Sequence, residues 1–593
     1  MAAAAGSPVI VGKNLRKHFH RKTGETVQAL DDVSFEVAPG TLTALVGPDG
    51  GGKTTLIRLV AGLMSVDGGE LSVLGLDART DQQAIQDRIG YMPQRFGLYE
   101  DLSVQENLDL YADLHGVSAA GRRAKYPQLM EMTALGPFTK RLAGQLSGGM
   151  KQKLGLACTL VRSPDLLLLD EPTVGVDPLS RRELWDIIRG LVRDQAVPVL
   201  LSTAYLDEAE LCEHVVVLRQ GKVLAQGPPG DVTALAKGRT FTAPPPGGQT
   251  VQAAQASLLD DPAVVDASPE AGRVRIVRGT EAPGAALARF QMEPAPARFE
   301  DGFMVLLQRA TAGAASATKA PTPAPPPPIA DPDQPSKREV VVKVRDLVRR
   351  FGKFVAVDRV SFEVRQGEIF GLLGPNGAGK TTTFRMLCGL LTATSGTLEV
   401  AGADLRRGAD AARRKIGYVA QKFSLYAQLT VAENLDFFAS AYGLHGAHRR
   451  ERIDWAMAQF ELRPLAHQLG GQLPGGYTQR LAMAAALLHE PRILFLDEAT
   501  SGADPLARRE FWRRITGLSQ TGVTVIVTTH FMAEAEYCDR IAILDSGRLL
   551  AQGSPAEIRA KGATAANHAP TMEDAFIAVI EQARAAAPRE QAA

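Results

Sequence analysis

The sequence has few cysteines, no long apolar run and no excess of one charge. Only four cysteines occur in 593 residues, and no two are spaced as a CxxC pair. This argues against a zinc or iron–sulfur site and suits free thiols in a reducing compartment. No stretch of about 18 uncharged apolar residues occurs, so no transmembrane helix is expected. The N-terminus lacks a basic segment followed by an apolar one, so we expect no signal peptide.

The charge is balanced, with 66 basic and 65 acidic side chains and a formal net charge of +1. This balance gives no reason to expect nucleic acid or an anionic lipid surface as the main partner. The length predicts several folding units, each with a core of its own. If the protein acts at a membrane, separate subunits must attach it there.

The chain contains an internal duplication. The segment GPDGGGKTT begins at Gly47 and GPNGAGKTT at Gly374, 327 positions later. The same offset separates GYMPQRFGLY from GYVAQKFSLY, and it relates Asp170 in LLLLDEPT to Asp497 in LFLDEAT. Several motifs at one offset indicate a duplicated domain.

Both copies contain a complete phosphate-binding loop, GxxxxGK[ST]. Each follows an apolar run that predicts a buried strand, at residues 42–46 and 369–373, and each precedes a helix-compatible run. The glycines let backbone N–H groups converge on phosphate oxygens, and the lysines reach the β- and γ-phosphates. The first threonine of each loop is a predicted Mg²⁺ ligand. The predicted nucleotide-binding residues are Gly47, Gly50, Gly52, Lys53, Thr54, Thr55, Gly374, Gly377, Gly379, Lys380, Thr381 and Thr382.

An acidic pair follows a second apolar run in each copy. Such runs are typical of central parallel strands, whose carboxyl ends carry the ligands in open α/β sheets. Asp170 and Asp497 are therefore predicted to hold Mg²⁺, directly or through water, and Glu171 and Glu498 to face the attacking water. An Asp-Glu pair alone could be a solvated turn, but a P-loop upstream in both copies favours the active-site interpretation.

Residues 146–152, LSGGMKQ, resemble the signature motif of ATP-binding-cassette proteins. The resemblance covers both copies and implies an α/β fold with two P-loop NTPase domains in tandem. In that family two domains dock head to tail, and ATP with Mg²⁺ lies between the P-loop of one and the signature of the other. The signature residues that the resemblance assigns to the nucleotide are Ser147, Gly148, Gly149 and Gln152 in the first copy and Gly475 and Gly476 in the second.

Further roles follow from the same resemblance. Gln94 and Gln421 match the Q-loop glutamine, which contacts Mg²⁺ or the attacking water. Asp177 and Asp504 match the D-loop aspartate that lies beside the nucleotide.

Three more residues resemble family elements. Phe19 and Phe351 occupy the position where the family stacks an aromatic ring on adenine, although core packing is an open alternative. His530 follows a predicted strand and matches the switch histidine that contacts the γ-phosphate.

The sequence between and after the copies predicts smaller elements. Residues 274–277 read as a strand, and residues 300–307 and 572–577 as helices. An Ala/Pro-rich tract precedes the second copy and is either a spacer or a proline-motif docking site. The predicted domains are a first cassette at 8–237, a small α+β subdomain at 238–310, a linker at 311–337, a second cassette at 338–562 and a C-terminal helix and tail at 563–593.

The two copies differ at functional positions. Ala204 stands in the first copy where His530 stands in the second, and Pro474 replaces the signature serine of the second copy. In a head-to-tail dimer both changes fall in the site built from the first P-loop and the second signature. We expect this site to turn over slowly and the other site to hydrolyse ATP. The alternative is that both sites work.

The sequences of these motifs resemble those of the fused, tandem ATP-binding subunit of ABC-2 type multidrug exporters. The resemblance implies two separate ABC-2 permease subunits as partners, no nucleic acid, intramolecular pairing of the cassettes, and a cytoplasmic location on the inner face of the membrane. Residues 96–99 and 423–426 are predicted to receive the permease, with core packing as the alternative. A ribosome-bound translation factor and a sugar-importer ATPase are the rival interpretations.

Overall fold

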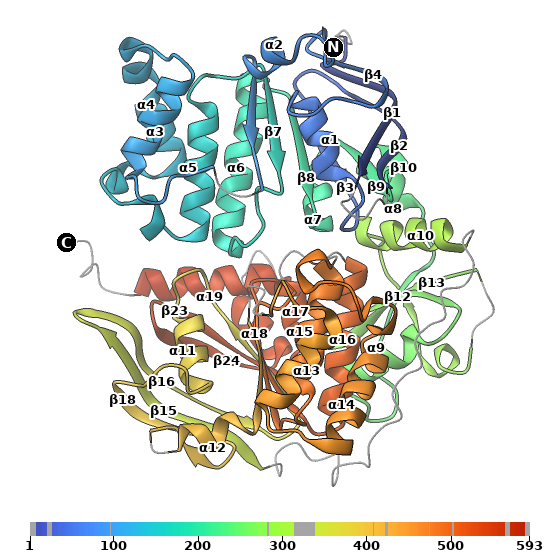
Figure 1. Cartoon of the computed structure of the whole chain (residues 1–593), viewed down its shortest axis with the longest axis vertical. Helices are drawn as coiled ribbons and strands as arrows, with labels where there is room; N and C mark the ends of the chain where they lie inside the picture. The colour runs from blue at the N-terminus through green and yellow to red at the C-terminus, as the bar shows by residue number, and fades with distance from the viewer. Residues whose placement is uncertain are drawn as a thin grey trace. The chain divides into compact units, whose positions relative to one another are not determined.

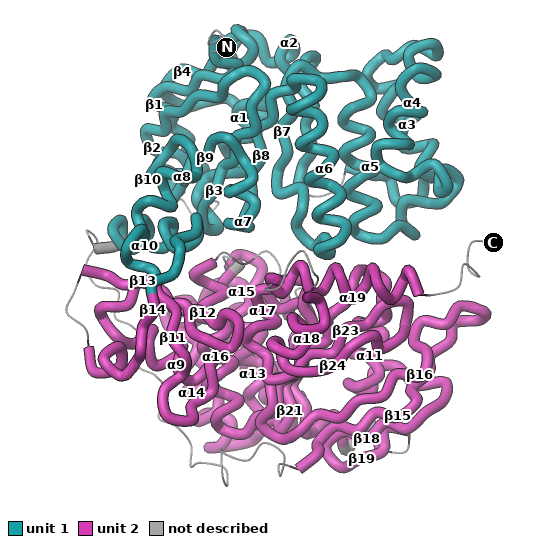
Figure 2. The backbone as a smooth tube through the Cα atoms, turned by 180° about the vertical axis from the view of Figure 1, so that it is seen from behind, with its two compact units in different colours: residues 1–240, 294–315 teal, residues 241–293, 316–593 magenta. Residues whose placement is uncertain are grey.

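Each half of the sequence folds into a layered α/β unit whose central strands are the apolar runs noted above. The chain forms two compact units, residues 1–240 with 294–315 and residues 241–293 with 316–593 (Figure 2). The computed structural model describes residues 7–20, 26–94, 97–280, 284–312, 339–406, 408–420, 425–473, 475–500, 503, 505–563 and 570–586.

The first unit contains two sheets. The central sheet has the order β10-β9-β3-β8-β7-β6 and is parallel except between β10 and β9. The other sheet is antiparallel, with the order β2-β1-β4-β5. The strands are β1 Ile10–His20, β2 Thr26–Val37, β3 Leu42–Val46, β4 Gly68–Val73, β5 Leu76–Asp77, β6 Ile89–Met92, β7 Leu166–Asp170, β8 Val199–Thr203, β9 His214–Arg219 and β10 Lys222–Gly227.

Helices cover both faces of the central sheet (Figure 1). The helix α1 packs between the two sheets, because Leu56 and Leu59 join a core made with Leu15 of β1 and Leu168 of β7. The helices of this unit are α1 Lys53–Val60, α2 Gln82–Gln86, α3 Val104–Leu114, α4 Ala119–Thr133, α5 Gly148–Leu160, α6 Pro178–Gln195, α7 Leu206–Ala209, α8 Pro229–Ala234 and α10 Phe299–Ala312.

The second unit repeats this architecture. Its central sheet has the order β20-β21-β22-β17-β23-β24, and its antiparallel sheet has the order β16-β15-β18-β19. In its core the ring of Phe384 meets that of Phe495 edge to face at 5.3 Å. The strands are β15 Val340–Phe351, β16 Phe354–Arg365, β17 Ile369–Leu373, β18 Ser395–Val400, β19 Ala403–Asp404, β20 Ile416–Val419, β21 Ile493–Asp497, β22 Thr524–Thr528, β23 Arg540–Asp545 and β24 Arg548–Gly553.

The helices of the second unit follow the order of the first. They are α11 Lys380–Leu387, α12 Ala409–Arg413, α13 Val431–Ala441, α14 Gly446–Gln459, α15 Gly475–Leu487, α16 Pro505–Gln520, α17 Met532–Ala535, α18 Pro555–Gly562 and α19 Met572–Ala586. None of the helices in the described part of the chain combines the length and the apolar composition that a membrane span needs.

Residues 241–293 form a small α+β subdomain that belongs to the second unit (Figure 2). The sheet has the order β12-β13-β11-β14, and α9 packs on it. Its elements are β11 Thr240–Ala243, α9 Val251–Leu259, β12 Val264–Glu270, β13 Arg273–Arg278 and β14 Glu293–Pro294.

The structure confirms the predicted elements that it describes. The strands expected at 42–46 and 369–373 are β3 and β17, and the one at 274–277 lies within β13. The helices expected at 300–307 and 572–577 lie within α10 and α19. The predicted linker from residue 313 onward lies outside the described residues, and the domain boundaries stay a prediction.

Candidate functional site

The two P-loops have the same conformation in their own units. The Nζ atom of Lys53 donates to the carbonyl of Gly47 at 2.8 Å and to the next carbonyl at 3.2 Å. Lys380 donates to the carbonyl of Gly374 at 2.6 Å and to the following one at 3.0 Å. Both lysines are buried, so each ammonium is held beneath the loop that its helix follows.

Backbone contacts explain why the first loop residue is glycine. A Cβ atom on Gly47 would lie 2.0 Å from the carbonyl oxygen of Leu218, and one on Gly374 would lie 2.3 Å from that of Leu544. No side chain fits at that distance, so the loop can pack on the neighbouring strand only with glycine there. The other predicted P-loop glycines all have positive φ angles, which other residues seldom adopt: Gly50, Gly52, Gly377 and Gly379.

Asp170 ends β7 beside the first P-loop. Its Oδ1 atom accepts hydrogen bonds from Thr54 at 3.1 Å and from Ser202 at 2.7 Å. Its Oδ2 atom is buried and has no hydrogen-bond partner among the described residues. An unpaired carboxylate oxygen next to a threonine hydroxyl fits the all-oxygen ligand set that Mg²⁺ prefers.

Asp497 ends β21 in the second unit and is 5% exposed. Its Oδ1 atom accepts a hydrogen bond from Thr528 at 2.6 Å. Burial raises the pKa of Asp497, and the Thr528 hydroxyl opposes that rise. A divalent cation would stabilise the carboxylate in the same way, so this position also fits Mg²⁺. Thr381, the other predicted ligand, is exposed at the start of α11.

The glutamates after these aspartates adopt an unusual backbone conformation. The φ angle of Glu171 is 51° and that of Glu498 is 47°, in the left-handed region that residues other than glycine seldom occupy. The chain turns at this residue, so the glutamate does not simply point to the opposite face of the sheet from the aspartate, as strand alternation would require.

Gln94 and Lys53 meet Glu171 in the first unit. Gln94 donates to Oε2 of Glu171 at 2.6 Å, and Lys53 Nζ lies 3.9 Å from Oε1. Burial raises the pKa of Glu171, while the charge of Lys53 opposes the rise. Four residues from three motifs, counting Asp170 beside Glu171, therefore lie together at the end of the sheet.

His530 is buried two residues after the end of β22. Its Nδ1 atom lies 3.4 Å from Oε2 of Glu498. Its Nε2 atom is buried and has no hydrogen-bond partner in the described part of the chain. A buried ring nitrogen of this kind needs a partner, and an anionic oxygen of a ligand would supply one.

Ala204 occupies the corresponding place in the first unit and is 4% exposed. The preceding threonine identifies the correspondence, because each donates to a buried glutamate in the next short helix. Thr203 donates to Glu208 at 2.5 Å, and Thr529 donates to Glu534 at 2.6 Å. The same frame thus holds an imidazole in one unit and a methyl group in the other.

A cavity of about 300 Å³ lies over the second P-loop. Its aromatic wall is Phe354, which is 65% exposed at the start of β16. The predicted Phe351 pairs with Phe354 across the strands, and Arg349 lies over its ring at 4.5 Å. Phe19 and Phe351 are both exposed, so the alternative that they are core residues is wrong. The lining also includes Asn376, Lys380, Thr381, Thr382 and Glu498.

Sequence reasoning missed Phe354. The signal was present, because Phe354 follows directly after the two-residue turn Gly352-Lys353 that leads out of β15. At a strand end, either member of a cross-strand pair can face the loop, and the sequence does not say which one does.

The first signature motif forms the start of α5. The Ser147 hydroxyl accepts a hydrogen bond from the Met150 N–H at 3.3 Å and so caps the helix, whose first residue is Gly148. A Cβ atom on Gly149 would lie 2.4 Å from the Ser180 side chain, so α6 can approach α5 only at a glycine. Gln152 is buried, and its Oε1 atom has no hydrogen-bond partner among the described residues.

The remaining predicted positions are placed as follows. Asp177 caps α6 and accepts from the N–H of Ser180 at 3.1 Å and from its hydroxyl at 3.0 Å. Thr55 lies in the first turn of α1, and Gly475 and Gly476 begin α15. Outside the described residues lie Gln421, Pro474, Asp504, Phe96 and Phe423.

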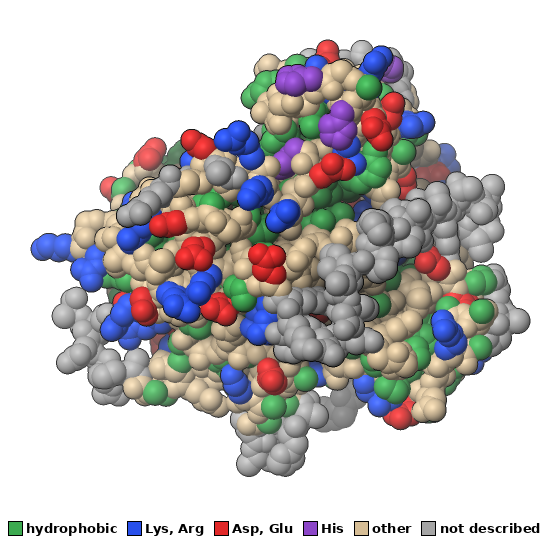
Figure 3. Space-filling model, turned by 90° about the horizontal axis from the view of Figure 1, so that it is seen from below, with side chains coloured by type: hydrophobic (Ala, Val, Ile, Leu, Met, Phe, Trp, Pro, Cys, Tyr) green, Lys and Arg blue, Asp and Glu red, His purple; other side chains and the backbone are tan. Residues whose placement is uncertain are grey.

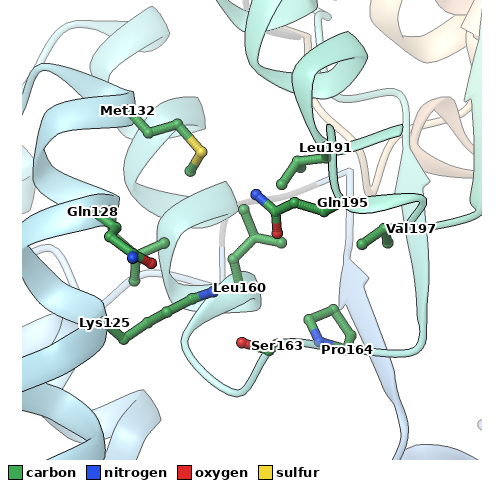
Figure 4. Close-up of a pocket in the computed structure, with 10 residues that line it drawn as sticks. Lys125, Gln128, Met132, Leu160, Ser163, Pro164, Leu191, Gln195 and Val197 are labelled. Carbon is green, nitrogen blue, oxygen red and sulfur yellow. The ribbon is translucent and has the colours of Figure 1, made fainter. Parts of the chain in front are cut away.

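A second cavity, of about 60 Å³, lies between α4, α5 and α6 (Figure 4), and the residues that line it do not belong to the P-loop. Lys125 and Ser163 line it. The equivalent residues of the second unit are Arg452 and Glu490, whose side chains pair at 3.1 Å, and Arg452 also covers the ring of Trp455 at 4.1 Å. At these two positions the second unit therefore carries larger side chains, which pair with each other.

Known proteins resemble this chain in sequence over both cassettes. The family model described as "ABC transporter" matches residues 30–174 and 357–501. A solved structure described as "Structure of ATP binding subunit of ABC transporter" is 29% identical and covers 40% of this chain and 99% of its own, with a TM-score of 0.38.

Two relatives illustrate the similarity. The "Probable multidrug ABC transporter ATP-binding protein YbhF" of Escherichia coli strain K12 is 47% identical over 580 residues, which are 96% of this chain and 98% of that protein. The "Nod factor export ATP-binding protein I" of Ralstonia nicotianae is 42% identical over 219 residues, 37% of this chain and 68% of its own. This chain belongs to the ABC transporter family and carries two of its ATP-hydrolysing cassettes in one polypeptide.

Proposed function

We propose that this chain is the ATP-binding and ATP-hydrolysing subunit of an ABC-2 type exporter, with drugs or other xenobiotic compounds as cargo. The observation that carries the proposal is the 47% identity over nearly the full length of both chains to a relative described as a probable multidrug transporter ATP-binding protein. The path for the cargo then lies in two separate permease subunits. In this proposal the chain acts on the cytoplasmic face of the membrane.

We assign the chemistry to residues at the ends of the central strands. Lys53 and Lys380 bind the phosphates of ATP. The threonine that follows each lysine, together with Asp170 or Asp497, would hold Mg²⁺, which would neutralise phosphate charge. Glu171 and Glu498 orient the attacking water in their respective cassettes. The exposed ring of Phe354 stacks on adenine.

The two ATP sites are unequal in this proposal. The cassettes pair head to tail, so one site joins the second P-loop to Ser147 and has His530, whereas the other joins the first P-loop to Pro474 and has Ala204. The unpartnered Nε2 atom of His530 supports a contact with the γ-phosphate that the other site lacks. The site with His530 hydrolyses ATP, and the other binds it and turns over slowly.

Exposed aromatic side chains support a docking surface for the permease. Tyr426 and Phe437 of the second unit are 48% and 42% exposed, and their rings meet edge to face at 4.7 Å. Tyr99 is 58% exposed in the first unit. Paired apolar side chains that water can reach are typical of protein interfaces, and these lie on or near the segments predicted to receive the permease.

The charge of the surface favours a protein partner over nucleic acid. On the face drawn in Figure 3, basic and acidic side chains of the described residues are interspersed. A nucleic-acid backbone needs a basic strip, which this mixing does not provide on that face.

Co-purification tests the proposed function. A tagged chain extracted from membranes in mild detergent is expected to bring with it integral membrane proteins of permease size, and Mg-ATP turnover is expected to rise when they are present. Matched extracts of ribosomes serve as the comparison. Recovery with ribosomes and not with membrane proteins contradicts the proposal.

A further inference from the structure

The small subdomain of residues 241–293 packs on the second cassette through a buried ion pair. Asp266 of β12 is 3% exposed and accepts hydrogen bonds from Arg509 of α16 at 3.1, 3.2 and 3.3 Å. Arg509 also donates to the hydroxyl of Tyr537 at 3.2 Å. A buried, bidentate contact of this kind holds its two partners in a fixed relative orientation.

Three other contacts surround this pair. Gln252 of α9 donates to the carbonyl of Tyr537 at 3.1 Å, and the N–H of Ala271 donates to Glu536 at 3.1 Å. At the outer edge, Arg513 lies 2.7 Å from Asp260. The subdomain therefore contacts α16 and the segment just after α17.

Both contacted elements, α16 and the segment after α17, lie next in the chain to residues assigned to the second ATP site. The helix α16 begins at Pro505, the residue after the D-loop aspartate, and α17 begins two residues after His530. The first turn of α16 also carries Arg508, the neighbour of Arg509. Arg508 donates to the carbonyl of Ala503 at 3.1 Å in the D-loop.

Arg508 also connects α16 with the segment that carries His530. Its guanidinium lies 3.5 Å from the carboxylate of Glu534 and 4.1 Å from the centre of the Phe531 ring. The rings of Phe531 and His530 lie 4.5 Å apart. A continuous series of contacts thus runs from the subdomain to the buried imidazole.

Among the described residues of the first cassette, the equivalent positions do not form this arrangement. Arg182 corresponds to Arg509 and is exposed in its unit. Leu211 corresponds to the buried Tyr537 and is 40% exposed. Asp186 stands where the second cassette has Arg513. The subdomain follows the first cassette in the chain, yet only the second cassette has the side chains that make these contacts with it.

We infer that Asp266 is a positioning residue for ATP hydrolysis in the second cassette, acting through Arg509 on the D-loop and on His530. The inference rests on the proposed function, because it assigns turnover to the site with His530. Asp266 touches neither nucleotide nor reacting water. Its effect is to fix the first turn of α16, and with it the side chain of Arg508 against Phe531 and Glu534.

The test compares Asp266→Asn with Asp260→Asn in the full chain. Both remove one negative charge from an ion pair with α16, but only Asp266 holds the arginine next to Arg508. For Asp266→Asn we expect kcat per bound nucleotide to fall roughly 2- to 30-fold, the range for substitutions along a coupled network. The KM for ATP and the stoichiometry of binding a non-hydrolysable ATP analogue should stay unchanged. Asp260→Asn should behave as wild type.

Two outcomes overturn the inference. One is a wild-type kcat in Asp266→Asn, and the other is a fall in kcat that matches a fall in nucleotide-binding stoichiometry, as a merely structural role would give. Arg509→Lys, which keeps the charge and loses the fork geometry, gives the same comparison if Asp266→Asn does not fold. Glu498→Gln is measured alongside. If Glu498→Gln abolishes turnover while Asp266→Asn keeps the wild-type kcat, only the positioning role of Asp266 is contradicted. If Glu498→Gln has no effect on turnover, the assignment of hydrolysis to the second ATP site is contradicted.

Discussion

Replacing His530 tests the assignment of the second ATP site from the geometry of one side chain. The imidazole is 5% exposed, its Nδ1 atom lies 3.4 Å from Glu498, and its Nε2 atom is unpartnered among the described residues. His530→Ala removes one hydrogen bond to a charged phosphate group, which contributes about 1.5–3 kcal/mol. If this contact strengthens in the transition state, turnover falls roughly 10- to 150-fold.

Steady-state ATPase rates measure this effect, and the affinity for a non-hydrolysable analogue separates it from loss of binding. Turnover should fall by more than the affinity does, and His530→Gln, which keeps a donor group, should recover part of the rate. A turnover rate for His530→Ala within twofold of wild type would refute the reasoning, because a buried donor facing the γ-phosphate cannot be removed without cost.

Two further predictions use the internal repeat as a control. Gly149→Ala places a Cβ atom 2.4 Å from Ser180 and should lower the free energy of unfolding by about 1–3 kcal/mol in denaturant titrations without nucleotide. The equivalent Gly476→Ala meets open space and should raise the free energy of unfolding by up to about 1 kcal/mol. Equal effects of the two substitutions would contradict the close approach of α6 to Gly149. Ser163→Glu should place a carboxylate beside Lys125, as Glu490 does beside Arg452, and should stabilise the first unit by about 0.2–1 kcal/mol in low salt, a gain that high salt removes. If Ser163→Glu gave no salt-dependent gain in stability, the pairing inferred from Arg452 and Glu490 would be contradicted.

Much of the fold followed from the sequence because the central strands are buried on both faces. Their continuous apolar runs stand out, and the P-loop glycines and the acidic pairs fix which ends of the strands face the ligand. The repeat then pairs the residues of the two copies, and aligning LSTAY with VTTHF sets Ala204 against His530, 326 positions apart and so one short of the offset of the other motifs.

Other features depend on contacts that the sequence does not encode locally. Asp266 and Arg509 are separated by 243 positions, so no pattern in either segment says that the subdomain belongs with the second cassette. Phe351 and Phe354 face each other across a strand pair, and only the course of the turn decides which ring borders the cavity.

The unequal chemistry of the two cassettes is tested most directly by neutralising the two glutamates in turn. ATPase rates of Glu498→Gln and Glu171→Gln are measured on the full chain under identical conditions, with nucleotide binding as the check on folding. We expect Glu498→Gln to lose turnover by roughly 10²-fold or more, and Glu171→Gln to keep it within a few-fold of wild type. Equal losses from the two substitutions would contradict the account.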